Sequence, residues 1–114
     1  MEPESREAGT RSTATVGSRE FSMFTRDVTV VNQLGLHARA AARFVHLATR
    51  YHAQIRVGRN SKVMDGKSIM GILLLAAARG TTITISADGP DERDAVEALA
   101  QLVASGFGEE TWNG

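Results

Sequence analysis

The spacing of hydrophobic side chains changes several times along the chain, and each change predicts an element of secondary structure. In four segments apolar side chains alternate with polar ones or form short runs, which is typical of strands. The second and third of these segments flank residues 58–60 (Gly-Arg-Asn), a sequence that favours a hairpin turn. The predicted strands are residues 24–31, 53–57, 61–64 and 81–87.

Three further segments are predicted to be helical. The first places its apolar side chains three and four positions apart, which makes one buried stripe. The second stops before Gly80, and the third begins beside Pro90, which fits the first turn of a helix. The predicted helices are residues 38–51, 68–78 and 91–104. The order β-α-β-β-α-β-α predicts an α+β fold, a two-layer sandwich in which helices cover one face of an antiparallel sheet.

The two ends of the chain differ from the segment between them. Residues 1–22 contain few large apolar side chains, too few to offset the entropy lost on ordering, so we predict a disordered N-terminal tail. Met23 lies directly before the first predicted strand, and we interpret it as the translation start, with the preceding residues an extension. We expect the folded domain over residues 23–106 and a C-terminal tail over residues 107–114.

The composition excludes several classes of function. The chain has 13 Lys and Arg residues and 13 Asp and Glu residues, so its net charge of zero gives no basic field for nucleic-acid binding. It has no cysteine, which excludes disulfides and cysteine zinc sites. The longest apolar run, residues 72–78, is shorter than the about eighteen residues of a membrane span. We therefore expect a cytoplasmic protein that neither binds nucleic acid nor inserts into a membrane.

The chemistry concentrates in residues 35–39 (Gly-Leu-His-Ala-Arg), where a predicted loop leads into the first predicted helix. A histidine at a helix start lies beside backbone N–H groups and the positive end of the helix dipole, which attract anions. An imidazole is a competent nucleophile at neutral pH, and Arg39 is placed to pair with phosphoryl oxygens. From these residues alone, His37 as a plain helix cap with a solvated Arg39 is the simpler interpretation.

Three motifs together change that interpretation. Residues 35–39, residues 65–71 (Asp-Gly-Lys-Ser-Ile-Met-Gly) and residues 83–89 (Ile-Thr-Ile-Ser-Ala-Asp-Gly) follow one another in this order. Over residues 24 to 108 the chain resembles the HPr family, the histidine-containing phosphocarriers of the bacterial phosphoenolpyruvate-dependent sugar phosphotransferase system. The motifs are similar to the family's active-site motif, its regulatory serine motif, and its last strand and turn. The resemblance implies an open-faced β-sandwich, with four antiparallel strands and three helices on one face.

The resemblance also implies a relay function. His37 would accept a phosphoryl group on Nδ1 from phosphorylated enzyme I and pass it to an enzyme IIA component of a sugar permease. Arg39 would neutralise phosphoryl charge, and the backbone of Ala38 and Arg39 would bind phosphoryl oxygens. Ala40 stands where the family commonly has proline, so some preorganisation of the first helical turn is lost. Such a protein is a carrier in a phosphotransferase relay, not a stand-alone enzyme for a small substrate.

Ser68 precedes the second predicted helix, where its hydroxyl can cap the helix. In part of the family the matching serine is phosphorylated by HPr kinase/phosphorylase, so capping and regulation are both open for Ser68. The following residues are apolar around most of the helix, yet one sheet buries only one stripe. The resemblance implies that the exposed remainder docks enzyme I and IIA proteins. The predicted interface residues are Ile69, Met70, Leu73 and Arg43.

Other functions are open at this point. The chain is also compatible with an HPr paralogue of the nitrogen-related phosphotransferase branch, or with a regulatory binding module controlled by phosphorylation of Ser68. Neutral charge argues against an RNA-binding domain. His46 and His52 lack the spacing of metal ligands, so we expect no metal and no other cofactor. We expect a monomer.

Overall fold

The computed structural model describes residues 23–111, and the predicted tail over residues 1–22 lies outside this range. The predicted element order is confirmed, with a short 3-10 helix added after the last α-helix. The strands form one antiparallel sheet in the order β1-β4-β2-β3. The elements are β1 (Phe24–Thr29), α1 (Ala38–Ala48), β2 (Gln54–Arg59), β3 (Lys62–Asp65), α2 (Ile69–Leu74), β4 (Thr82–Asp88), α3 (Glu92–Ala104) and η2 (Gly106–Thr111).

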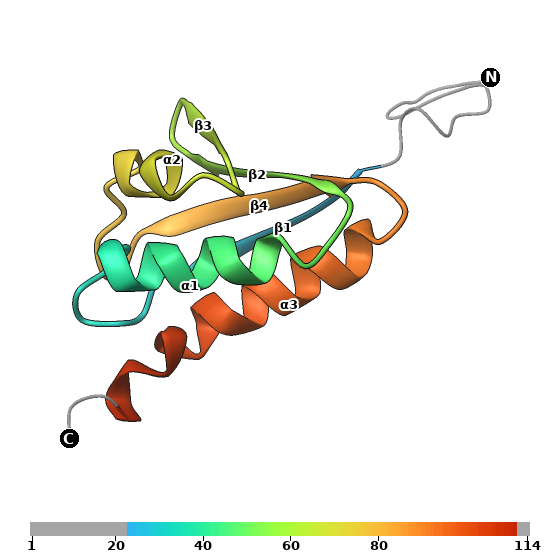
Figure 1. Ribbon diagram of the computed structural model, residues 1–114. Helices are drawn as coiled ribbons and strands as arrows, with labels where there is room; N and C mark the ends of the chain where they lie inside the picture. The colour runs from blue at the N-terminus through green and yellow to red at the C-terminus, as the bar shows by residue number, and fades with distance from the viewer. Residues whose placement is uncertain (1–22, 112–114) are drawn as a thin grey trace.

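The helices cover one face of the sheet and leave the other open, as predicted. Along β4, Ile83 and Ile85 are fully buried, whereas their neighbours on the opposite face are partly or fully exposed. Ile55 and Val57 continue the buried face onto β2. α1 and α3 run side by side beneath the sheet, and α2 lies beside the end of α1 where that helix begins (Figure 1). The core therefore lies between these helices and the central strands.

The second helix is shorter than the prediction of residues 68–78. It ends at Leu74, and Ala76 adopts the left-handed region at φ 51°. The carbonyl groups that follow the helix accept hydrogen bonds from other parts of the chain. Arg59 Nη1 donates to the carbonyl oxygen of Leu75 at 2.9 Å, and the N–H of Leu36 donates to the carbonyl oxygen of Ala77 at 2.9 Å. These tertiary hydrogen bonds outweigh the helical propensity of the alanines.

Other boundaries also differ from the predictions, and the first strand, predicted over residues 24–31, ends at Thr29. α1 ends at Ala48 and not at Tyr51. β2 continues through Arg59, so the hairpin turns at Asn60, whose φ of 56° suits asparagine in a tight turn. Of the helices between residues 23 and 111, none has the length and apolar character that crossing a bilayer requires.

Residues 107–111, part of the segment 107–114 for which the sequence predicted a tail, belong to the 3-10 helix η2, and residues 112–114 lie outside the described range. Phe107 is fully buried in the core, although its φ of 58° is unfavourable for a residue with a side chain. Burial of the ring offsets this backbone strain. Because Phe107 is anchored, the chain turns back toward the start of α1, where it places Glu109.

Asp91 joins the start of α3 to the loop that precedes β2. Its carboxylate accepts hydrogen bonds from the backbone N–H groups of His52 and Ala53, both at 2.8 Å. These hydrogen bonds, that of His52 foremost, hold the pKa of the Asp91 carboxyl below its usual value because they favour the ionised form. One side chain thus links two loops that are distant in sequence.

We predict that Asp91 makes stability depend on acid pH. The pKa of Asp91 is lower in the folded state than in the unfolded state, so the ionised carboxylate stabilises the fold fully at pH values above the unfolded-state pKa. This stabilisation is lost as the pH falls through the folded-state pKa. Asp91→Asn should therefore be less stable than the parent at about pH 6, and the difference should narrow toward about pH 2. Urea unfolding across this range measures it, with Asp88→Asn as the control. A difference that is constant with pH would contradict the assignment.

Candidate functional site

His37 is the residue from which α1 begins. Its backbone is extended (φ −81°, ψ 179°), and its carbonyl accepts the first helical hydrogen bond, from the N–H of Ala41 at 2.8 Å. The imidazole makes no capping hydrogen bond to its own helix. It therefore occupies the cap position through its backbone, while its half-buried ring contacts a side chain outside the helix.

The loop before His37 is held by a close backbone contact. Gly35 has a φ of 66°, and a Cβ at this position would lie 2.5 Å from the carbonyl oxygen of Ala77. The N–H of Leu36 donates to that same oxygen at 2.9 Å, and Asn32 Nδ2 donates to the carbonyl of Gly35 at 2.7 Å. Only glycine fits this position, because it tolerates both the left-handed backbone and the approach of Ala77.

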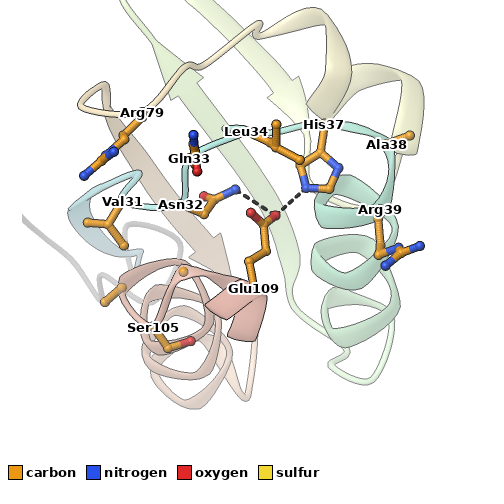
Figure 2. Close-up of a pocket in the computed structure, with 12 residues that line it drawn as sticks. Val31, Asn32, Gln33, Leu34, His37, Ala38, Arg39, Arg79, Ser105 and Glu109 are labelled. Atoms are coloured by element: carbon orange, nitrogen blue, oxygen red, sulfur yellow. Dashed lines mark hydrogen bonds and ion pairs between the residues drawn. The ribbon is translucent and has the colours of Figure 1, made fainter. Parts of the chain in front are cut away.

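A carboxylate from the far end of the chain completes the site. Glu109 Oε2 contacts His37 Nε2 and also accepts a hydrogen bond from Asn32 Nδ2 at 2.9 Å (Figure 2). Sequence analysis missed both Asn32 and Glu109. Asn32 is indistinguishable from an ordinary turn residue, and Glu109 comes near His37 only because Phe107 is buried, which the hydrophobic pattern does not indicate.

The histidine opens onto a pocket that also collects cationic side chains. Arg39, from the first turn of α1, and Arg79, from the segment before β4, are among its lining residues, and Figure 2 shows both guanidinium groups turned outward from the His37 ring. Guanidinium groups and a helix N-terminus suit an anionic group such as phosphoryl. Within residues 23–111 no group of three or more His, Asp and Glu side chains is placed to hold a metal ion.

Ser68 and the predicted interface lie on and around α2. Ser68 caps this helix, since its Oγ accepts a hydrogen bond from the N–H of Gly71 at 3.0 Å. The exposed surface of α2 is apolar: Ile69, Met70 and Leu74 are 44%, 65% and 53% exposed. Leu73 is only partly exposed and packs against the core, so Leu74 contributes more of this surface than Leu73 does. Arg43 is exposed on α1.

The chain matches a family model and characterised proteins over the described fold. The model for the "PTS HPr component phosphorylation site" matches residues 24–105. Phosphocarrier protein HPr of Cupriavidus necator is 49% identical over 87 residues, which are 76% of this chain and 98% of that protein. Phosphocarrier protein HPr of Pseudomonas aeruginosa is 49% identical over 84 residues, which cover 73% of this chain and 93% of the relative.

Solved structures give the same result. The crystal structure of HPr from Thermoanaerobacter tengcongensis has a TM-score of 0.72 and 41% identity, over 75% of this chain and 96% of that one. A phosphocarrier protein HPr from Bacillus anthracis has a TM-score of 0.70 and 45% identity, over 72% of this chain and 98% of that one. The shared fold extends over nearly the whole of both solved chains.

We predict that Gly35→Ala destabilises the protein by about 3 kcal/mol or more, from left-handed strain plus the clash with Ala77. Gly80→Ala is the matched control, because Gly80 has a φ of 89° but no atom that a Cβ would meet within 4 Å. This control should cost only about 1 kcal/mol, the backbone strain alone. Thermal and urea unfolding of both variants measure the difference, and equal losses would contradict the role of the close contact.

Proposed function

The chain belongs to the HPr family, the phosphocarriers of the phosphotransferase system, and on this premise we propose that His37 is its phosphoryl acceptor. Phosphorylated enzyme I is the proposed donor, and an enzyme IIA component of a sugar permease is the proposed acceptor from this chain. The observation that carries the proposal is the position of His37, which begins α1 and shares a pocket with Arg39. The protein then acts as a carrier that its partners load and unload.

The surroundings of His37 support phosphoryl transfer by positioning and electrostatics. The transferred group carries negative charge, which the planar guanidinium of Arg39, a residue that lines the same pocket, would neutralise. The backbone N–H groups of Ala38 and Arg39 belong to the first turn of α1 and point toward the helix start, where the dipole also favours anions. Each of these interactions strengthens as phosphoryl charge arrives, which is the condition for accelerating transfer.

The exposed apolar residues of α2 are the proposed docking surface for enzyme I and IIA proteins. They lie on α2, which is next to the start of α1 (Figure 1) and has Ser68 as its N-cap. We further propose that HPr kinase/phosphorylase modifies Ser68, that the protein is monomeric, and that it works in the cytoplasm, where phosphoenolpyruvate is available. Phosphohistidine at His37 is the intermediate that links these partners to sugar uptake.

His37 is predicted to be the sole acceptor of phosphate from enzyme I. Incubation with phosphoenolpyruvate and enzyme I should add a single acid-labile, base-stable phosphate, measured by intact-protein mass spectrometry. His37→Ala should abolish the label, because no other nucleophile shares its place at the helix start. His46→Ala and His52→Ala, at two exposed histidines, are the matched controls and should label fully. A phosphate retained by His37→Ala would overturn the proposal.

Charge at Ser68 is predicted to weaken docking without unfolding α2. Ser68→Asp places a negative charge at the rim of the apolar surface, where it opposes an acidic partner. A carboxylate also suits a helix cap, so the melting temperature should be unchanged or slightly higher. Titration calorimetry against enzyme I should show affinity reduced by about tenfold, whereas the hairpin control Ser61→Asp should bind like the parent. Unchanged affinity for Ser68→Asp, or a large loss of stability, counts against this mechanism.

A further inference from the structure

Glu109 is held in the site by a specific arrangement. Its side chain is 11% exposed and that of His37 is 24% exposed, so the contact between them is largely shielded from water. A carboxylate in such a position needs hydrogen-bond donors to offset its desolvation. His37 Nε2 and Asn32 Nδ2 both converge on the same oxygen, Glu109 Oε2 (Figure 2).

The backbone on both sides fixes where this carboxylate lies. Phe107, two residues earlier, is fully buried, and Gly108 between them adopts a φ of 71°. On the other side Asn32 is 5% exposed, and its Nδ2 donates both to Glu109 and to the carbonyl of Gly35. Glu109 is therefore tied to the core through Phe107 and to the loop that carries His37 through Asn32.

This contact determines which ring nitrogen can react. A carboxylate in its ionised form only accepts hydrogen bonds, so this contact favours the tautomer in which His37 Nε2 carries the proton. A neutral imidazole carries one N–H, which leaves the lone pair on Nδ1. Figure 2 shows the other ring nitrogen on the side of the ring turned away from Glu109.

We propose that Glu109 is a positioning residue for phosphoryl transfer: it holds the His37 ring and its Nε2 proton so that Nδ1 faces the donor as the nucleophile. The inference rests on the proposed function of His37 and adds a residue that no motif of the chain identifies. A purely structural role would require only the contact between Glu109 and Asn32, and it would not affect which ring nitrogen of His37 is protonated.

The proposed step balances without any additional proton donor or acceptor. The lone pair of Nδ1 forms the N–P bond as the P–N bond of the donor phosphohistidine breaks, and that electron pair returns to the donor nitrogen. The donor ring, protonated on its other nitrogen, leaves as a neutral imidazole, while His37 keeps its Nε2 proton and becomes a cation. Glu109 attracts the His37 ring more strongly as this charge develops, so it favours the transition state over the ground state.

The kinetic test compares three variants with the parent in rapid-quench phosphorylation by phosphorylated enzyme I. Glu109→Ala should lower kcat on the order of tenfold, the lower end of the loss seen when the carboxylate that orients a metal-ligating histidine is removed. KM should change less than about twofold, because docking lies on α2. Glu109→Gln keeps the shape and an acceptor oxygen but not the charge, so its kcat should lie between those of Glu109→Ala and the parent. Glu97→Gln, on the exposed face of α3, should match the parent.

A spectroscopic test reads the contact without any partner. In long-range 1H–15N spectra at alkaline pH, the parent should show a protonated Nε2 and an unprotonated Nδ1 at His37, with the Nε2 proton slowed in exchange. Glu109→Ala should lose this slow exchange, while Glu97→Gln should retain it. The melting temperatures of both variants should equal that of the parent.

The outcomes separate this inference from the proposed function. If the parent chain accepts no phosphate at His37, the proposed function fails, and the spectra still decide the contact. If His37 is phosphorylated but Glu109→Ala has the kcat of Glu97→Gln, or loses rate only through KM, the positioning role is wrong. If Glu109→Ala does not fold, the isosteric Glu109→Gln decides, and a kcat equal to the parent's overturns the inference.

Discussion

The site around His37 depends on one place where two stretches of backbone meet with no side chain between them. Gly35, in the left-handed conformation, lies against Ala77, and the N–H of Leu36 binds the Ala77 carbonyl oxygen at 2.9 Å. This contact fastens the loop before α1 to the segment that leaves α2. As a consequence, α2 lies beside the start of α1, where His37 stands, although different parts of the chain supply them.

Positive and negative side chains lie close together around His37, and we assign them different roles. Arg39 and Arg79 line the pocket, which suits an arriving dianionic group, yet a carboxylate, Glu109, lies among them. A carboxylate would repel the phosphoryl group if it stood on the same side of the imidazole. Bound to Nε2, it lies on the side of the ring away from Nδ1, and in the proposed transfer it would meet the positive charge that the ring acquires. The net neutrality of the whole chain conceals this local order.

The hydrophobic pattern was sufficient for most of the fold, because the strands and helices each bury one face and periodicity records that property directly. It did not place the end of α2, since Ala76 leaves the helix for tertiary hydrogen bonds that no local pattern encodes. The motif at residues 35–39 singled out His37 and Arg39 as candidates, and the two residues line one pocket in the structure. Glu109 escaped detection because its position follows from the burial of Phe107, a long-range packing event beyond the last periodic segment.

The strand order has a consequence for how the chain is made. β1 and β2 never pair with each other; both pair with β4, which is the last strand to be synthesised. Until Asp88 has emerged from the ribosome, a nascent chain contains β1 and β2 but not the complete β4 that joins them. The sheet therefore cannot be completed until nearly the whole domain has emerged, and during that interval β1 and β2 lack the strand that joins them.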